Sequence, residues 1–560
     1  MDNELITNQY FHVEENIPWN IYPRPQMKRE SFCNLNGEWD FEASPYEYPP
    51  QKYSMKITVP YPVESALSGV GKHFRRGNKL YYRRYFDAPI KLRWRRVLLH
   101  CGGIDQKAEI FINGHFVVSC CTAIEGPLEV DVTPFLLDEN ELIIKVVDDM
   151  DKNVPYGKQS ENPKEIWYSP VSGIWQTVWL ESVPEYYIKG LKITTTLDYA
   201  DVEIAGVDEG RVLFEGKSYR FYDGKIRLTP MVKKHWSPED PHLYYFSVQV
   251  GNDKVDSYFA LRTLEIKDAY GLKRLCLNGE PYFFNGVLHQ GYWKDGLYTP
   301  EKADDYKFDI ITAKNLGFNT IRKHLKIEAE EFYYQCDKLG MIVFQDMVNN
   351  GKYSKIRDVV FPVIGFTKFS DKLKHRGKVQ RRSYINAAQS TVKTLYSHPC
   401  ICYWTLFNEG WGQFCSSQIY DLIKGLDSTR FIDSASGWFK GGKTDVESIH
   451  CYFKKFNMPR TDKPIVLSEF GGYSLKINDH SSEDAGYGYK NFEDKLSFVD
   501  AIRKLYREEV IPAIGMGLCG CIYTQFCDIE KETNGLITYD RKYIKTDDGL
   551  FKPFKDKLKL

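Results

Sequence analysis

The hydrophobic pattern of this chain changes its period near residue 275, and this change constrains the fold more than any other feature. After that point short apolar runs alternate with amphipathic stretches: PYFFNGVLH precedes PEKADDYKFDIITAKNLG, and FNTIRKH precedes EAEEFYYQCDKLG. The runs MIVFQDM, ICYWTLF, RFIDSAS, SIHCYF, PIVLSEF and LCGCIYTQF complete about eight predicted strands. About eight strand–helix units in ~290 residues predict a (β/α)8 TIM barrel. An open doubly wound sheet is the alternative, although no GxGxxG follows the first strand.

One predicted helix of this region can be described residue by residue. The stretch YKFDIITAKNLG has the spacing of an amphipathic helix that ends at Gly317. Its expected apolar face consists of Phe308, Ile310, Ile311 and Leu316.

The chain before residue 265 has the pattern of β-structure. Short runs such as NLNGEWDFEA, KLYYRRYFDAP, AEIFINGHFVV and ELIIKVV are separated by Gly, Asn, Asp and Pro, which predicts a β-sandwich over 1–185. Within FINGHFVV, Asn113-Gly114 predicts a type I′ hairpin turn. Further strands over 186–264 predict a small immunoglobulin-like sandwich, in which WSPEDPHLY (236–244) is a crossover. The barrel then spans 265–560.

Composition excludes several classes of function. Lys+Arg and Asp+Glu both number 75, so no global field favours nucleic acid or an anionic membrane. The basic stretch KLKHRGKVQRR (372–382) is interpreted as a solvated face leading into a helix. The 13 cysteines show no disulfide framework and no zinc spacing. The first residues, MDNELITNQYFHVEEN, lack the apolar region of a signal peptide, and no apolar run reaches the ~20 residues that span a bilayer. We expect a cytoplasmic protein with reduced thiols.

Two glutamates stand where apolar strands end. Glu409 lies in LFNEGWGQF and Glu469 in PIVLSEFGGY, and glycine follows each of them. Either residue by itself can mark only the solvated edge of a strand. In a barrel, however, the carboxyl ends of the strands meet at one face, where active sites lie. Two carboxylates facing one pocket are what a glycosidase requires, one to protonate the leaving oxygen and one to attack the anomeric carbon or activate water. Asn408 is then placed to hold the sugar's 2-hydroxyl.

Other polar or aromatic residues near the predicted strand ends are candidates for binding a sugar. They are His289, Arg322, His324, Asp346, Trp411, Trp438, His450, Tyr452 and Gln525. For some of them a structural role is equally compatible with the pattern. His289 and His324 can be packed for structural reasons, Asp346 can cap the next helix instead of gripping two hydroxyls, and both tryptophans can belong to a loop core instead of an aromatic wall.

The chain resembles glycoside hydrolase family 2, the β-galactosidase, β-glucuronidase and β-mannosidase group, along nearly its whole length. The resemblance is carried by RPQMKRESFCNLNGEWDF, VPYPVESALSGVG, YYRRYF, INGHFV, YSPVSGIWQTVWLE and LCLNGEPYFFNGV, and by the two glutamate motifs, LFNEGWG and LSEFGG. It implies the domain order jelly roll, immunoglobulin-like sandwich, TIM barrel. It also implies that Glu409 is the acid/base and Glu469 the nucleophile of a retaining mechanism. Tyr452 then resembles the tyrosine that hydrogen-bonds the nucleophile, and Arg322 the arginine lying under it.

The sequence departs from parts of the family pattern. No Glu-x-His follows Asp346, so we expect no catalytic magnesium and no other cofactor. The stretch QFCDIEKETNGLITYDRK has no Asn-x-Lys motif of the kind with which β-glucuronidases grip the sugar carboxylate. The chain closes on the helix-like FKPFKDKLKL soon after the eighth strand, so we expect no domain beyond the barrel. The resemblance also implies a homo-oligomer, as a dimer or tetramer.

The first hypothesis is therefore an exo-acting retaining β-glycosidase that acts on small oligosaccharides or glycosides, with β-galactosides as the first substrate class. A β-glucuronidase, β-galacturonidase or β-mannosidase is the alternative within the family. A non-catalytic carbohydrate-binding protein on a degenerate barrel is the alternative from another class.

Overall fold

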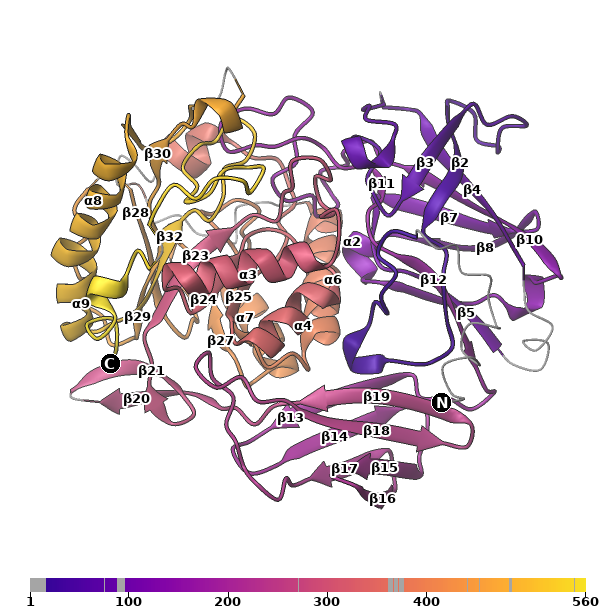
Figure 1. Ribbon diagram of the computed structural model, residues 1–560, viewed down its shortest axis with the longest axis horizontal. Helices are drawn as coiled ribbons and strands as arrows, with labels where there is room; N and C mark the ends of the chain where they lie inside the picture. Colours follow the sequence, from indigo (N-terminus) through magenta and orange to yellow (C-terminus); the bar gives the residue numbers. More distant parts are fainter. Residues whose placement is uncertain are drawn as a thin grey trace.

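The computed structural model describes residues 17–560 apart from residues 75, 88–95, 270, 361–365, 367–370, 372–376, 441, 453, 483–485 and 548. Within these residues the chain builds two units of antiparallel sheets beside a parallel barrel (Figure 1). Two sequence interpretations fall wholly or partly outside the described part: the expected lack of a signal peptide, which concerns residues 1–16, and the first five residues of the basic stretch, 372–376.

The N-terminal unit is a sandwich of a six-stranded and a four-stranded sheet, with orders β3-β2-β4-β10-β7-β8 and β1-β12-β5-β9. The larger sheet consists of β2 (Gly37–Ser44), β3 (Met55–Val59), β4 (Lys79–Asp87), β7 (Lys107–Ile112), β8 (His115–Cys120) and β10 (Glu139–Val147). The smaller consists of β1 (Phe32–Asn34), β5 (Arg96–Cys101), β9 (Leu128–Asp131) and β12 (Val178–Val183). One apolar cluster that includes Trp39, Phe41, Ile144 and Leu180 fills the core.

The predicted hairpin is confirmed. β7 and β8 pair antiparallel around Asn113 and Gly114, which have φ angles of 51° and 78°. Positive φ at both central residues is the mark of a type I′ turn, whose twist matches that of the flanking strands.

A second unit follows, with a three-stranded and a four-stranded sheet around a core that includes Val202, Phe214 and Phe246. The strands are β13 (Gly190–Thr195), β14 (Ala200–Ala205) and β17 (Lys225–Leu228), then β15 (Gly210–Phe214), β16 (Lys217–Phe221), β18 (Tyr244–Val250) and β19 (Asp253–Phe259). Residues 236–244 lead from β17 in one sheet to β18 in the other, so the predicted crossover is confirmed. The boundaries 1–185, 186–264 and 265–560 stay predictions, as do the jelly-roll and immunoglobulin-like types.

The predicted barrel is also confirmed: eight strands form one parallel sheet in the order β27-β26-β25-β24-β23-β32-β29-β28. They are β23 (Phe284–His289), β24 (Thr320–Lys323), β25 (Ile342–Asp346), β26 (Ile401–Thr405), β27 (Phe431–Asp433), β28 (Glu447–Cys451), β29 (Ile465–Gly471) and β32 (Leu518–Thr524). Each corresponds to one of the predicted apolar runs. Among the described residues no ladder joins β27 to β28, so the barrel is nearly closed. A small sheet of β20 (Leu264–Ala269), β21 (Leu272–Leu277) and β22 (Glu280–Pro281) precedes it.

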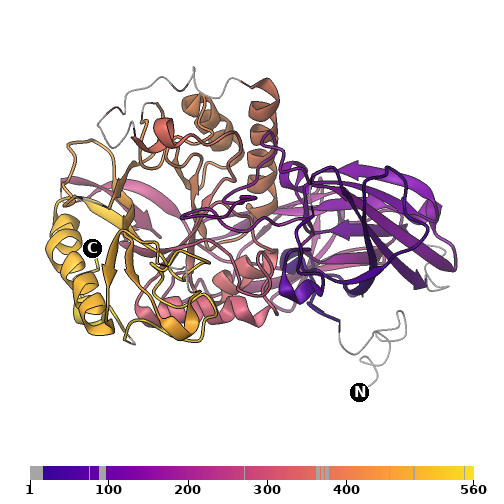
Figure 2. The ribbon, with the colours of Figure 1, turned by 90° about the horizontal axis from the view of Figure 1, so that it is seen from above.

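Helices cover the outside of the barrel (Figures 1 and 2). They are α3 (Asp304–Leu316), α4 (Glu330–Leu339), α6 (Lys378–Leu395), α7 (Ser416–Leu426), α8 (Lys495–Leu505) and α9 (Ile511–Gly515). The connections from β27 to β28 and from β28 to β29 contain no α-helix among their described residues, unlike the regular unit that the sequence predicted. The first connection is rich in glycine and the second contains Pro459 and Pro464, residues that disfavour helix.

Two helical expectations need correction. α3 ends at Gly317 as expected, but its buried face includes Tyr306, Asp309 and Ile310, whereas Phe308 and Ile311 are 44% and 37% exposed. Phe308 lies two positions from Ile310, so it turns away from the face that Ile310 buries. The C-terminal FKPFKDKLKL contains one 3-10 turn, Lys552–Phe554, and turns instead of an α-helix.

The N-terminal sandwich packs directly on the barrel. Helix α2 (Thr122–Glu125) of the sandwich contacts α6, and the Ser390 hydroxyl donates to the Glu125 carbonyl at 2.7 Å. Farther along, the Tyr168 hydroxyl hydrogen-bonds Glu532, and the Ser169 amide donates to Glu530 at 2.8 Å. Segment 148–172 of the sandwich therefore lies against the loops that follow the barrel strands.

Candidate active site

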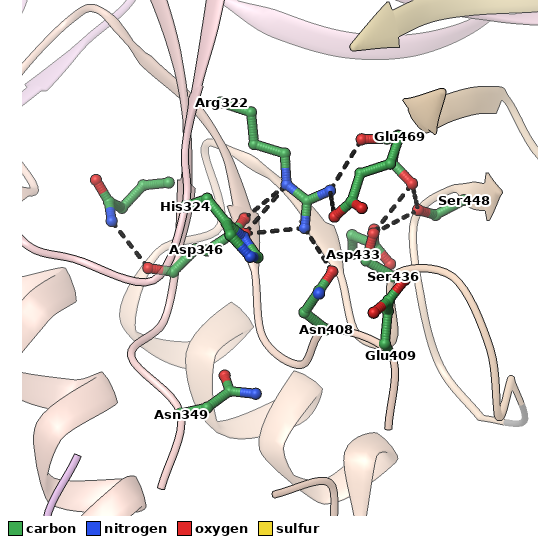
Figure 3. A network of polar contacts seen from close by, with 12 residues as sticks. Arg322, His324, Asp346, Asn349, Asn408, Glu409, Asp433, Ser436, Ser448 and Glu469 are labelled. Atoms are coloured by element: carbon green, nitrogen blue, oxygen red, sulfur yellow. Dashed lines mark hydrogen bonds and ion pairs between the residues drawn. The ribbon is translucent and has the colours of Figure 1, made fainter. Parts of the chain in front are cut away.

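The two strand-end glutamates meet at the carboxyl end of the barrel (Figure 3). Glu469 belongs to β29, and Glu409 lies four residues beyond the last residue of β26. One carboxylate oxygen of Glu409 and one of Glu469 lie within 4.8 Å of each other. The Glu469 side chain is 7% exposed and that of Glu409 24%, so solvent reaches Glu409 more readily.

The backbone around Glu409 explains the glycines that follow it. Glu409 has a φ of 52°, the left-handed region that non-glycine residues seldom adopt, and Gly410 and Gly412 have φ angles of 74° and 70°. A Cβ on Gly412 would lie 2.7 Å from the Asn350 carbonyl oxygen. The chain therefore turns sharply just after strand β26, which places Glu409 over the end of the barrel.

Arg322 is the hub of the polar network beneath the glutamates. From β24 its guanidinium donates to Asp346 at 2.8 Å, to Glu469 at 3.1 Å and to the Asn408 side-chain oxygen at 2.9 Å. It also donates to the Ser468 carbonyl at 2.9 Å and is 1% exposed. Figure 3 shows it between Asp346 on one side and Glu469 on the other. This planar fork fixes three side chains, which come from β25, from the end of β26 and from β29.

The surroundings of Glu469 favour its ionised form. Burial raises the pKa of its carboxyl, but the charges of His450 and Arg322 and the hydrogen bond from Tyr452 outweigh burial and hold the pKa below its ordinary value. The Tyr452 hydroxyl donates to Glu469 at 2.6 Å, and its ring stacks on Tyr489 with centroids 4.1 Å apart. Tyr452 therefore lies where the sequence places it, beside the second glutamate.

His450 lies between the two glutamates. Its Nδ1 atom is 2.8 Å from Glu409 Oε1 and 3.4 Å from Glu469 Oε2, and its side chain is fully buried. The sequence proposed His450 as a residue that contacts sugar, but the structure brings it to the carboxylates instead. Glu409, His450 and Glu469 each offer one ligand atom within 4.8 Å of the others, a nitrogen and oxygen set of the kind that divalent cations use. The expectation that the protein has no metal stays a prediction.

Two other sequence candidates are held in buried contacts. His289 is fully buried at its side chain, and its two ring nitrogens lie 3.0 Å from Asp309 and 2.8 Å from Lys323. Gln525 is 0% exposed and its amide is hydrogen-bonded to Gln290 and Asn534. Neither residue has a free face for a sugar, so both expectations are corrected.

Asp346 and His324 occupy the floor of the site. Asp346 is 1% exposed, and both of its oxygens accept from Arg322, while Oδ2 also lies 2.7 Å from His324 Nδ1. Asp346 does not cap a helix, and neither of its oxygens is free to bind two hydroxyls. In place of the two roles that the sequence suggested, Asp346 is an ion partner of Arg322. His324 is 2% exposed and stays next to this pair.

The two tryptophans differ in their surroundings. Trp411 is 4% exposed, donates to the Gly351 carbonyl at 3.0 Å and packs in a cluster with Tyr156 and Leu325, which fits a loop core better than a bare wall. Trp438 is partly exposed and lies edge-on to the His450 ring, with centroids 5.4 Å apart. Its indole Nε1 atom has no hydrogen-bond partner among the described residues.

The structure adds residues that the sequence reading missed. Tyr156 of the sandwich donates to the Gly351 carbonyl at 2.8 Å, and Trp167 packs edge-on against Trp411 at 5.1 Å. Lys158, on the same segment, interacts electrostatically with His324 and Glu532. No sequence signal connects segment 148–172 to the barrel, because the contacts span about 200 residues of chain or more.

A separate cavity lies where the sandwich meets the barrel. It has about 1410 Å³ of empty space, part of it open to solvent, and its lining includes Trp175, Tyr306 and Ala387. Neither Glu409 nor Glu469 lines it, so the chemistry indicated by the carboxylates belongs to the end of the barrel. Among the described residues, no helix combines the length and the apolar character needed to traverse a bilayer.

Comparison with known proteins identifies the barrel. Residues 265–475 match the model described as "Glycosyl hydrolases family 2, TIM barrel domain". A β-galactosidase of Thermoanaerobacter pseudethanolicus is 24% identical over 48% of this chain, and a β-galactosidase large subunit of Latilactobacillus sakei is 23% identical over 70%. The chain spans only 39% and 64% of the lengths of these two relatives.

A solved structure shares the whole arrangement. The β-D-glucuronidase of Dictyoglomus thermophilum superposes with a TM-score of 0.72 at 17% identity, over 96% of this chain and 98% of its own. That likeness concerns the fold, including the sandwiches that precede the barrel. Together the two comparisons lead to one conclusion: residues 265–475 match the TIM barrel domain of glycosyl hydrolases family 2, and the chain as a whole has the fold of the solved structure.

Proposed function

We propose that this protein is an exo-acting retaining β-glycosidase that works by double displacement. The observation that carries the proposal is the separation of the two carboxylates, of which one oxygen each lies within 4.8 Å. Retaining enzymes hold the two carboxyl groups about 5–5.5 Å apart, whereas inverting enzymes leave about 6.5–9.5 Å for a water molecule.

In the proposed first step, a Glu469 oxygen attacks the anomeric carbon as the bond to the leaving oxygen breaks. The proton of Glu409 passes to that oxygen, and a glycosyl ester forms on Glu469. In the second step Glu409 takes a proton from water, whose oxygen attacks the same carbon and releases Glu469. The lowered pKa of Glu469 suits the nucleophile, which must be ionised at the start.

Asn408 is proposed to bind the sugar's 2-hydroxyl. Its side-chain oxygen accepts from Arg322 at 2.9 Å, which fixes the amide and leaves the nitrogen without a hydrogen-bond partner among the described residues. A hydrogen bond to the 2-hydroxyl strengthens in the oxocarbenium-like transition state and therefore accelerates the chemical step.

β-Galactosides are the first proposed substrate class. The two curated relatives are named as β-galactosidases, which supports this choice.

A second class, the β-uronides, is favoured by Lys158. This half-buried ammonium interacts electrostatically with His324 and Glu532, yet no carboxylate lies within ion-pair distance of it among the described residues. A cation with no such partner at the edge of the site is suited to a sugar carboxylate. β-Mannosides remain the third alternative.

A panel of aryl β-glycosides tests the proposal and discriminates these classes. Galactoside, glucuronide, galacturonide, mannoside and glucoside are compared by kcat/KM for the wild type, for K158M and for K164M, a control on an exposed lysine of the same segment. If uronides are substrates, K158M loses their cleavage selectively while K164M does not. If no member is cleaved at any pH while sugars still bind, the protein is a carbohydrate-binding protein and the proposal fails.

A further inference from the structure

The ring of His450 joins the two proposed catalytic carboxylates. Nδ1 lies 2.8 Å from Glu409 Oε1 and 3.4 Å from Glu469 Oε2. On β28 His450 pairs in register with Glu469 of β29, directly after a β-bulge in which Ser468 is an extra residue of β29. The bulge matters because a shift of one residue changes the side of the sheet to which a side chain points.

The other ring nitrogen is held by a cluster of three serines. His450 Nε2 lies 3.0 Å from the Ser436 hydroxyl. Ser436 contacts Ser448 at 3.1 Å and Ser468 at 3.0 Å, and the last two are 2.6 Å apart. These hydroxyls bridge β28 and β29 to the loop after β27, across the gap where the barrel has no ladder. Both nitrogens of the ring therefore have fixed partners.

The walls around His450 leave its ring little freedom. Gly437 has a φ of 86°, and a Cβ at this position would lie 2.9 Å from His450 Nδ1. Trp438 packs edge-on against the ring. The side chain is 0% exposed. A ring held on both edges can position a neighbour as well as fill space.

The contact between Nδ1 and Glu409 Oε1 requires a proton between the two atoms, because two lone pairs at 2.8 Å repel each other. With that proton in place, one oxygen of Glu409 is directed toward His450. The other oxygen is left for the leaving group. An acid catalyst that is aimed in this way loses less entropy in the transition state.

We propose that His450 is a positioning residue that holds the Glu409 carboxyl in the orientation needed for proton transfer to the leaving oxygen. This inference rests on the proposed function. Two ionisable groups contact His450, Glu409 and Glu469, and the cation of the network, Arg322, pairs with Glu469 and Asp346. This cation does not reach Glu409 in an ion pair, which leaves His450 as the partner of this carboxyl among the described residues.

Substitutions can test the contacts of the two His450 ring nitrogens separately. In H450N the amide nitrogen lies near the place of Nδ1, so a donor to Glu409 is retained. In H450Q the amide lies near the place of Nε2, so Glu409 loses its partner. S436A removes the hydroxyl at Nε2 and leaves His450 itself in place. H480N is the matched control, because His480 contacts Asp540 at 2.8 Å and does not touch either glutamate.

The readout is the dependence of kcat/KM on the leaving group. For the sugar that the wild type cleaves, the phenyl glycoside needs a proton on its departing oxygen, whereas the 2,4-dinitrophenyl glycoside does not. H450Q is expected to lose at least about tenfold on the phenyl glycoside and little on the dinitrophenyl glycoside, since general acid catalysis contributes about 10²–10⁴-fold. The ratio of kcat/KM for the dinitrophenyl glycoside to kcat/KM for the phenyl glycoside should stay close to the wild-type value in H450N. It should shift toward the H450Q value in S436A and stay unchanged in H480N.

Equal losses on both glycosides, or no loss in H450Q, would overturn the inference. Thermal melts show whether each variant folds. If the His450 variants do not fold, S436A is used for the test in their place. E409A tests the acid/base role of Glu409 separately from the positioning role of His450. If it shows the leaving-group dependence and H450Q does not, the positioning role fails and the glycosidase stands. If the wild type cleaves no glycoside of either kind, the proposed function and this inference fail together.

Discussion

Arg322 Nη1 lies 3.1 Å from Glu469 Oε1, and both side chains are buried. The same guanidinium is paired with Asp346 at 2.8 Å, so its position does not depend on Glu469 alone. A fixed cation beside a buried carboxylate stabilises the ionised form of that carboxylate. The relationship therefore predicts how the proposed nucleophile responds to pH.

Replacement of Arg322 by lysine should shift the pH profile. Lysine keeps the charge but cannot form the planar contacts to Asp346, Glu469 and Asn408 together. A group with a depressed pKa is active in its ionised form above that pKa and loses this form as pH falls through it. In R322K the pKa of Glu469 rises, so the acid limb of kcat/KM should move to higher pH, and kcat should fall roughly 100-fold. An unchanged acid limb, with R211K on the sandwich surface as control, would contradict the electrostatic account.

Gly412 should tolerate alanine poorly. Its φ is 70°, and a Cβ would lie 2.7 Å from the Asn350 carbonyl oxygen, a backbone atom that cannot swing aside. G412A is expected to lower the free energy of unfolding by about 1–3 kcal/mol and to displace Glu409. Gly425 in α7 provides the control, since no atom lies within 4 Å of its Cβ position and helical alanine is favourable. Urea unfolding and kcat are measured for G412A and G425A. Equal changes in the two variants would rule out a strained turn at Gly412.

His289 should contribute to stability in a pH-dependent way. Burial and the nearby Lys323 lower its pKa to about 4, against an opposing effect of Asp309. Between pH 6.5 and 4 the unfolded chain binds a proton at this residue that the folded chain excludes, so stability is fully present above pH 6.5 and falls as pH decreases. The loss is about 3 kcal/mol over that window. Urea unfolding at pH 7 and pH 4.5 should show a smaller decrease for H289N than for the wild type; the same decrease in both would refute a depressed pKa.

Strand ends and turns could be predicted because their signals are local. Each apolar run of the barrel is followed by polar residues, and parallel strands bring those residues to one edge, which is how Glu409, Glu469, Arg322 and Tyr452 were found. The hairpin turn could be predicted because Asn113 and Gly114 both tolerate the positive φ angles that it requires.

The direction of a side chain at a strand end was not predictable in the same way. His289 pairs in register with Lys323, and both point away from Arg322, because successive side chains of a strand face opposite sides. A β-bulge at Ser468 in β29 sets the side on which Glu469 meets His450, and the sequence carries no sign of it. Contacts from segment 148–172 depend on the packing of the sandwich against the barrel, which no local pattern encodes.

The central claim is that Glu469 forms a covalent bond with the sugar. The most direct measurement uses the 2,4-dinitrophenyl glycoside of the 2-deoxy-2-fluoro analogue of the sugar that the wild type cleaves, because fluorine at that position slows release of the ester. Intact-mass and peptide mass spectrometry then locate the added sugar. The account predicts one sugar per chain on the peptide that contains Glu469, and none in E469A. A sugar on another residue, or continued turnover without any adduct, would contradict it.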